Sequence, residues 1–205
     1  MPALDTTHLL ALAAALGWAS GLRLYAVVFL TGLAGSMGWV ALPEGLKLLQ
    51  QPPLLWASGA LLLVEFAADK VPWVDSLWDA VHTVIRVPAG AALAWSVFGG
   101  DQAAWAAAAA LAGGALAATA HAAKATTRAA VNTSPEPFSN IALSLLGDAF
   151  VPLMLWLSQA HPVVFFVALA LALVVSIVLI VVLLRFMRGF ARRLRAHFAS
   201  SPAGA

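Results

Sequence analysis

The sequence predicts an all-α, polytopic helical membrane protein with about six transmembrane helices. Hydrophobic residues make up 62% of the chain and charged residues only 10%, whereas soluble domains carry about 25% charged residues. The mean hydropathy is +0.93. Apolar stretches long enough to cross a bilayer recur along the chain, and the clearest covers residues 161–184.

The first half of the chain contains three expected spans, over residues 8–36, 54–69 and 76–98. The first carries Gly17 and Gly21 at a spacing that permits close helix contact, followed by Arg23. A glycine-rich helix with no role in helix pairing is the alternative. The second span is short, and the third is apolar only from about Val87 onward. We therefore expect a re-entrant or interfacial polar segment between the second and third spans.

The second half contains the spans 102–125, 138–158 and 161–184. Pro135 and Pro137 break any helix that continues from the alanine-rich fourth span. Ser139 and Asn140 are suitable N-terminal caps for the fifth span. The sixth span is nearly free of polar side chains and is followed directly by five arginines.

The arginines after the last span predict the orientation, because basic segments remain in the cytoplasm. Six spans then place both termini on the cytoplasmic side of the membrane. We expect one transmembrane domain at residues 1–190 and a basic tail at residues 191–205 that attracts anionic lipid headgroups. A homo-oligomer is compatible with the sequence, and nothing argues for nucleic-acid binding. We expect no removable signal peptide, because the N-terminus lacks a basic segment.

A weak internal repeat pairs the second and third spans with the fourth and fifth. Residues 59–61 recur as residues 114–116, and the same offset aligns Asp69 with Lys124. Alanine-rich helices also match by chance, so two-helix repeat units are one interpretation of this pattern. If the repeat is real, both polar connections lie on one side, and Asp69 approaches Lys124 near the membrane interface.

The main functional signal is a charged face on the third span. Asp75, Asp79, His82 and Arg86 follow one another at i,i+4, i,i+3 and i,i+4 spacing, so they share one helix face. Ionisable groups at membrane depth are costly and mark functional sites by default. We expect Asp79, His82 and Arg86 to form the centre of a substrate- or ion-binding site, with Asp75 at its mouth.

Further candidates for the same site come from the other spans and from the two polar connections. They are Glu65, Asp69, Lys124, Arg128, Asn140 and Asp148. Glu65 and Asp148 are single carboxylates inside apolar spans and are expected deeper in the site. A purely structural ion pair is the alternative for Asp69 and Lys124, and snorkelling to the headgroups is the alternative for Lys70. One connection is mainly acidic and the other mainly basic, so we expect them to face each other.

The sequence requires no cofactor. It contains no cysteine, which excludes disulfides and thiolate chemistry. Asp75, Asp79 and His82 are candidate ligands for a divalent metal. However, the chain contains no HExxH motif, glycine-rich phosphate loop or GxSxG elbow.

Three classes of function remain open. The leading hypothesis is a transporter or channel-like permease for a small polar or ionic solute. The alternative is a membrane-embedded metal-dependent enzyme that acts on a phosphorylated lipid or headgroup. The third is a structural or assembly subunit whose charges only pair helices. A polar path that reaches both faces would favour transport, and a divalent metal on Asp75 or Asp79 would favour the enzyme.

Two strings carry a resemblance to known proteins: EFAADKVPWVDSLWDAVHTVIRVPAG at residues 65–90 and VNTSPEPFSN at residues 131–140. Through them the chain resembles an uncharacterised family of small bacterial integral membrane proteins, catalogued only as a domain of unknown function. The resemblance extends from about Gly17 to about Pro162. It implies a helical membrane protein, which we therefore expect in a bacterial inner membrane, and it adds weight to both polar strings. It brings no activity, substrate or catalytic residue.

Overall fold

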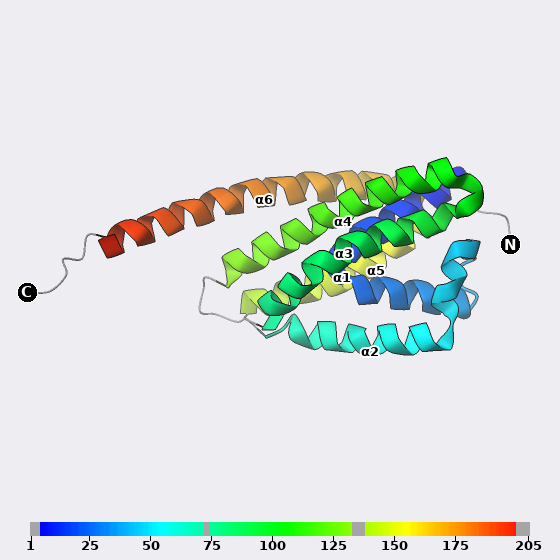
Figure 1. Cartoon of the computed structure of the whole chain (residues 1–205), viewed down its shortest axis with the longest axis horizontal. Coiled ribbons are helices and arrows are strands. Elements are labelled where there is room, and N and C mark those ends of the chain that lie inside the picture. Colours follow the sequence, from blue (N-terminus) through cyan, green and yellow to red (C-terminus); the bar gives the residue numbers. More distant parts are fainter. Residues whose placement is uncertain (1–4, 72–73, 133–137, 200–205) are drawn as a thin grey trace, which may run out of the picture.

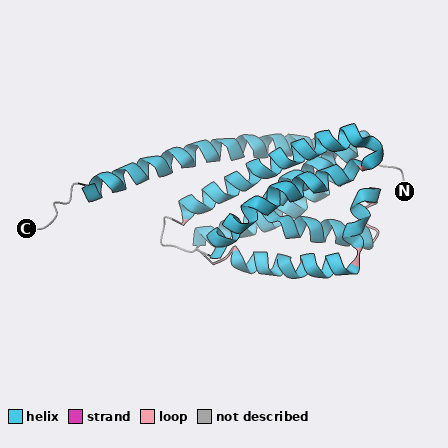
Figure 2. Cartoon of the chain, in the orientation of Figure 1, coloured by secondary structure: helices cyan, strands magenta, loops and turns pink. Residues whose placement is uncertain are grey.

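A computed structural model gives the structure of residues 5–71, 74–132 and 138–199. Within these ranges the chain forms helices and no strands (Figure 2). In chain order the elements are α1 (Thr6–Ser36), η1 (Glu44–Gln50), α2 (Pro52–Ala68), α3 (Val74–Phe98), η2 (Gly100–Gln102), α4 (Ala103–Val131), α5 (Phe138–Ala160) and α6 (Pro162–Ala199).

Most of the helices have the length and composition of membrane spans. Five qualify: α1, α3 from Leu77, α4, α5, and α6 up to Gly189. With 17 residues, α2 is about 25 Å long, slightly less than the hydrocarbon core of about 30 Å. The protein is therefore an all-α polytopic membrane protein, as predicted. The helical backbone of α6 also continues through Ala199, into the segment expected to form the basic tail.

Helix α1 consists of two half-helices that meet at Arg23. The backbone there leaves the helical region, with φ −147° and ψ 83°. The first half runs parallel to α4, because Gly17 packs against Gly113 and, one turn later, Gly21 packs against Ala117. A Cβ atom at Gly17 would lie only 2.5 Å from the Cα atom of Gly113. The two glycines therefore permit close helix contact, as predicted, and the contact is made within the chain.

The second half of α1 runs in the opposite direction. Gly32 lies against Leu55, and Phe29 lies against Gly59, so this half is antiparallel to α2. Helices α2 and α4 both run from right to left in Figure 1. The two halves of α1 must therefore be antiparallel to each other.

A shared cavity provides independent evidence for this reversal. Leu12 in the first half and Thr31 in the second half line the same cavity of about 420 Å³. In a straight helix, residues 12 and 31 would be about 29 Å apart. Instead of the expected single span over residues 8–36, α1 is a hairpin that starts and ends at the same end of the bundle. The sequence predicts the re-entrant segment between α2 and α3. In the structure α2 ends at Ala68 and α3 begins at Val74, and the chain reverses within α1 instead.

The hairpin changes the expected topology. After it, the five helices α2–α6 each run the length of the bundle, so the N-terminal end of α1 and the C-terminal end of α6 lie at opposite ends (Figure 1). This arrangement does not fit the expectation that both termini are cytoplasmic, because an even number of full spans is needed for that. We call the end that carries the α2–α3 and α4–α5 connections the polar end.

Helices α1 and α6 differ most in how deeply they are buried. Helix α1 is mostly buried and contacts each of α2–α6, so it forms the centre of the bundle. Helix α6 is mostly exposed and presents rows of valine, isoleucine and leucine. Such a surface is suited to contact with lipid, because lipid tails are as apolar as these side chains.

We expect epitope tags at the two termini to be reached from opposite faces of the membrane. The physical reason is the reversal at Arg23, which leaves five full crossings after the hairpin. Accessibility to a protease in sealed right-side-out and inverted vesicles measures this. A tag inserted between Gly99 and Gly100 is the control, because this turn lies at the same end as the N-terminus. If both terminal tags are cleaved from one face, the hairpin is wrong.

Candidate functional site

The polar end of the bundle holds ten charged side chains that are buried or half-buried and connected by ion pairs. The carboxylates and cations are equal in number, so their formal charges cancel. Removing charges from water is costly unless each has a partner, and a balanced set meets this requirement. We call these residues the charge network: Glu65, Asp69, Asp75, Asp79 and Asp148, with Arg23, Lys70, Arg86, Lys124 and Arg128.

The tip of the α1 hairpin is anchored in this network by Arg23. Its Nη2 atom lies 2.9 Å from Oδ2 of Asp69, and its Nε atom lies 3.0 Å from Oδ1 of Asp148. Nη2 also donates to the carbonyl oxygen and the hydroxyl of Ser144, at 3.1 and 3.0 Å. Arg23 is only 2% exposed. The point where α1 breaks is thus bonded to the end of α2 and to α5.

A second part of the network is centred on Arg86 in α3. Its Nη2 lies 2.7 Å from Oε1 of Glu65, and its Nη1 lies 2.7 Å from Oδ1 of Asp79. Nη1 also donates to Nδ1 of His121, at 3.2 Å. Because arginine only donates, His121 accepts at Nδ1 and carries its proton on Nε2, which bonds to the Thr83 hydroxyl at 2.8 Å. His121 is therefore held as the neutral imidazole.

Lys124 joins the two parts. Its Nζ lies 3.0 Å from Asp69 and 3.1 Å from Asp79. The predicted approach of Asp69 and Lys124 is confirmed, and with it the expectation that the acidic connection faces basic residues. Lys124 thus connects the anchor of the α1 tip to the Arg86 pairs.

Arg128 joins α4 to α2, α3 and α5 at the polar end. Its Nη1 donates to the carbonyl oxygen of Asp69 at 3.0 Å, and Asp69 is the C-cap of α2. A cation at a helix C-terminus also interacts favourably with the helix dipole. Nη1 further donates to the backbone carbonyl of Asn140 at 3.0 Å and to its side-chain oxygen, in the first turn of α5. Nε lies 3.7 Å from Asp75.

Lys70 turns toward the bundle as well. Its Nζ lies 3.5 Å from Oδ2 of Asp148 and donates to the carbonyl oxygen of Phe66 at 3.2 Å. The side chain is 24% exposed, so it is half-buried rather than extended to the headgroups. Lys70 and Arg23 therefore share the carboxylate of Asp148.

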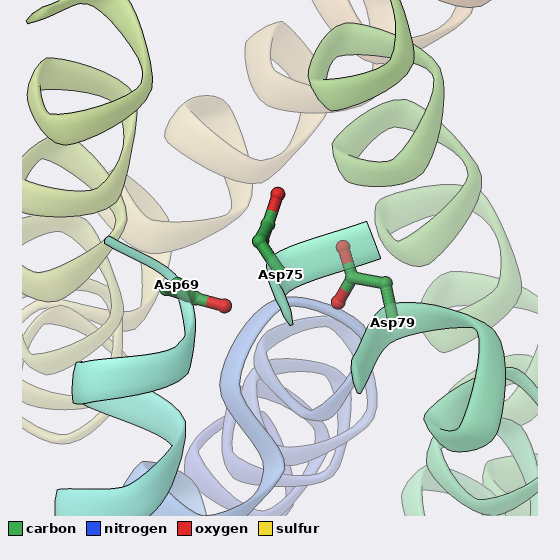
Figure 3. Close-up of side chains that lie close together, drawn as sticks. All are labelled: Asp69, Asp75 and Asp79. Atoms are coloured by element: carbon green, nitrogen blue, oxygen red, sulfur yellow. The ribbon is translucent and has the colours of Figure 1, made fainter. Parts of the chain in front are cut away.

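Three carboxylates of the network form a compact group (Figure 3). Asp69, Asp75 and Asp79 each offer an oxygen within 4.8 Å of the others, and all three are buried. The metal ligands expected from the sequence were Asp75, Asp79 and His82, so Asp69 takes the place of His82 in this group. The Lys124 ammonium, however, lies between Asp69 and Asp79 and already supplies a positive charge there. The arrangement favours an ion-pair network over a metal centre.

Asp75 is the least well paired of the three. Its two carboxylate oxygens accept no hydrogen bond from the part of the chain that the structure describes. Burial raises the pKa of Asp75 to about 6, and the nearby Arg128 opposes this rise. Asp75 precedes the apolar segment Leu77–Phe98. Asp75 is fully buried, so its ionised form is stabilised mainly by the nearby Arg128.

His82 lies at the edge of the network rather than at its centre. Its Nδ1 donates to the carbonyl oxygen of Trp78 at 2.7 Å, so its Nε2 is left to accept from the Tyr25 hydroxyl at 3.0 Å. The imidazole also stacks on Trp78, with 4.2 Å between the ring centroids. His82 thus connects α3 to the second half of α1.

The structure brings together the residues that the sequence singled out, with one displaced. Nine of them belong to the network or bond to it, and His82 lies beside it: Glu65, Asp69, Asp75, Asp79, Arg86, Lys124, Arg128, Asn140 and Asp148. Their role in binding a substrate or ion stays a prediction.

Three network members or neighbours were missing from the predicted site: Arg23, Lys70 and His121. The signal for Arg23 was a single arginine within a long apolar span, which is expensive in a membrane unless it has a function. The signal for His121 was its helix face, which it shares with Lys124 and Arg128. Both signals could have been used.

The fold and this site define a polytopic helical membrane protein with a buried, charge-balanced polar network. A family model described as "Domain of unknown function (DUF4126)" matches residues 10–182, and the chain belongs to that family. The predicted resemblance to an uncharacterised family is thereby confirmed, over a longer stretch than expected. Comparisons with curated proteins and with solved structures find no match.

We expect Arg86→Met to destabilise the protein strongly, by about 3–5 kcal/mol, because it leaves Glu65 buried without its cation. The double variant Glu65→Gln with Arg86→Met should recover part of this loss, since Asp79 keeps Lys124 as a partner. Thermal unfolding in detergent measures both. Lys47→Met is the control, because its pair with Glu44 is exposed and worth about 0–1 kcal/mol. Equal stability of the single and double variants would refute this pairing.

Proposed function

We propose that the protein is a transporter or channel-like permease for a small polar or ionic solute. The observation that carries this proposal is the broken helix α1, whose tip inserts Arg23 into the charge network. Irregular backbone at membrane depth is tolerated where it is buried in protein or lines a cavity. Discontinuous helices that point their ends at a polar site are a recurring feature of transporters.

The network is also within reach of open space. A cavity of about 480 Å³ touches Arg23, Asp69, Lys124 and Arg128. A solute of either charge entering here would compete for existing ion pairs. Because Asp69 binds both the hairpin tip and Lys124, such competition would loosen α1 from α2 and α4. This supports α1 as the moving element.

The two other classes of function are less well supported. A metal-dependent enzyme would need the three carboxylates of Figure 3 to bind a metal ion. Lys124 already pairs with two of them, Asp69 and Asp79. A purely structural subunit does not need charges, because replacing a buried ion pair by packed apolar residues is often neutral or stabilising. The presence of ten charged side chains inside the bundle therefore favours a function that uses them.

We further propose a bacterial inner membrane and an orientation for the chain. Arg185, Arg188 and Arg192 belong to the C-terminal part of α6. The C-terminal end of α6 extends beyond the polar end (Figure 1). Basic segments remain in the cytoplasm, so the polar end and the C-terminus would be cytoplasmic. The hairpin then places the N-terminus on the outer side.

Alternating access is tested with a single cysteine in this cysteine-free chain. Ser144→Cys is a small change at a position that is 1% exposed and bonded to Arg23. If the network is a transport site, a membrane-impermeant methanethiosulfonate reagent should modify this cysteine when added from either face. Right-side-out and inverted vesicles, followed by mass spectrometry, measure the modified fraction.

Ser158→Cys is the matched control for this experiment. Ser158 is a buried serine in the same helix, near the opposite end, where it bonds to the Leu155 carbonyl. It should not be modified from the polar end. Modification of Ser144→Cys from one face only, or from neither, would exclude transport through the network.

A further inference from the structure

The cavity beside the hairpin tip combines a cationic end with long apolar walls. It has a volume of about 480 Å³, within the range of pockets that hold drug-sized ligands, and it lies among α1, α4, α5 and α6. We propose that this cavity binds a membrane lipid with an anionic phosphate headgroup. This goes beyond the proposed function, because it concerns a ligand from the bilayer and does not depend on transport.

The polar residues at one end of the cavity carry an excess of positive charge. Arg23, Lys124 and Arg128 line it together with a single carboxylate, that of Asp69. The side chains of all four are at most 10% exposed. Phosphate oxygens accept strong charge-assisted hydrogen bonds from arginine and lysine. The local excess of cations therefore matches an anion rather than a second cation.

One atom of Arg23 is left for such a ligand. Its Nε and Nη2 atoms are bonded to Asp148, Asp69 and Ser144. Its Nη1 atom is buried and has no hydrogen-bond partner among residues 5–71, 74–132 and 138–199. A buried donor without a partner is costly. A phosphate oxygen that reached Nη1 would give this donor a partner and leave the four bonds to Asp148, Asp69 and Ser144 in place.

The remaining walls are apolar and open toward the surface. Six large side chains dominate them: Leu143, Leu146, Phe150, Leu153, Val175 and Leu179. Leu146, Leu153 and Val175 are exposed, so the cavity opens sideways on the face that contacts lipid. A small free anion would leave these walls uncovered. A lipid would cover them with its acyl chains.

The packing of the helices provides a route of entry. Helices α4 and α5 make few direct contacts with each other, and α6 contacts both. Helix α6 therefore lies over the gap between α4 and α5, and the exposed side chains of Leu146, Leu153 and Val175 mark where the cavity opens to the surface. The cationic residues lie at the polar end, where the headgroup of a lipid in that leaflet would be found. The charge of the cavity, its apolar walls and its position at the polar end all match a lipid with an anionic phosphate headgroup.

Native mass spectrometry of the detergent-purified chain tests this inference. Dioleoyl phosphatidic acid and dioleoyl phosphatidylcholine are added at equal concentration. We expect phosphatidic acid to be retained about tenfold more, since one charge-assisted hydrogen bond is worth enough for such a ratio. Equal retention of the two lipids by the unaltered chain would overturn the proposal, whatever the variants show.

Two variants fill the cavity without removing a charge. Ser176→Phe fills it from α6, where Ser176 is 8% exposed. Gly147→Leu fills it from α5, where an added Cβ meets only Nε of Arg23, at an ordinary distance of 3.5 Å. Both should lose the preference for phosphatidic acid while remaining monodisperse in gel filtration. Val178→Phe is the matched control on α6, because Val178 is 54% exposed and should leave lipid retention unchanged.

A final comparison separates the lipid from a free anion. Sodium phosphate is added in place of lipid, and thermal stabilisation is measured. We expect phosphatidic acid to stabilise the unaltered chain and Ser176→Phe to lose this effect, with little effect of inorganic phosphate. Stabilisation by inorganic phosphate that equals that of the lipid, or a Ser176→Phe variant that keeps its preference, would refute a lipid site. Lipid retention is measured without any transport. A negative lipid result therefore leaves the Ser144→Cys test of the proposed function unaffected.

Discussion

The polar end of the bundle depends on the ion pairs that the carboxylate of Asp69 forms. This carboxylate lies 2.9 Å from Arg23 and 3.0 Å from Lys124, and the backbone carbonyl of the same residue accepts from Arg128. Asp69 therefore joins the tip of α1, the end of α2 and the side of α4. Without it, Arg23 would keep only Asp148 and Ser144 as partners, and the tip of α1 would lose its bond to the end of α2.

The balance of the network explains why so many charges are tolerated at this depth. Each carboxylate has at least one cation within 4.0 Å, and most of the cations serve two carboxylates. Such sharing means that one new charge disturbs several pairs together. Under the transport function that we propose, a bound ion would rearrange several of these pairs together.

Composition and hydropathy were sufficient to predict the class and the helices, and the internal repeat with its opposite charges predicted the meeting of Asp69 with Lys124. The reversal of α1 was not predicted, because its apolar residues surround the helix evenly and the break at Arg23 is stabilised by Asp69 and Asp148, far along the chain. The displacement of His82 has a similar cause, since its partner Tyr25 belongs to the second half of that hairpin. Local spacing predicts which residues share a helix face, but it does not predict which distant residue will approach that face.

The most direct test of the account is the distance between the two halves of α1. Leu12→Cys and Thr31→Cys, introduced together into the cysteine-free chain, face one cavity in the hairpin. A straight helix would hold them about 29 Å apart. We expect a short bismaleimide to link them efficiently within one chain, as detected by mass spectrometry of the joined peptides, and each single variant to give no such product. Failure to form the link in folded protein, with both cysteines reactive toward a monofunctional maleimide, would contradict the hairpin and the site built on its tip.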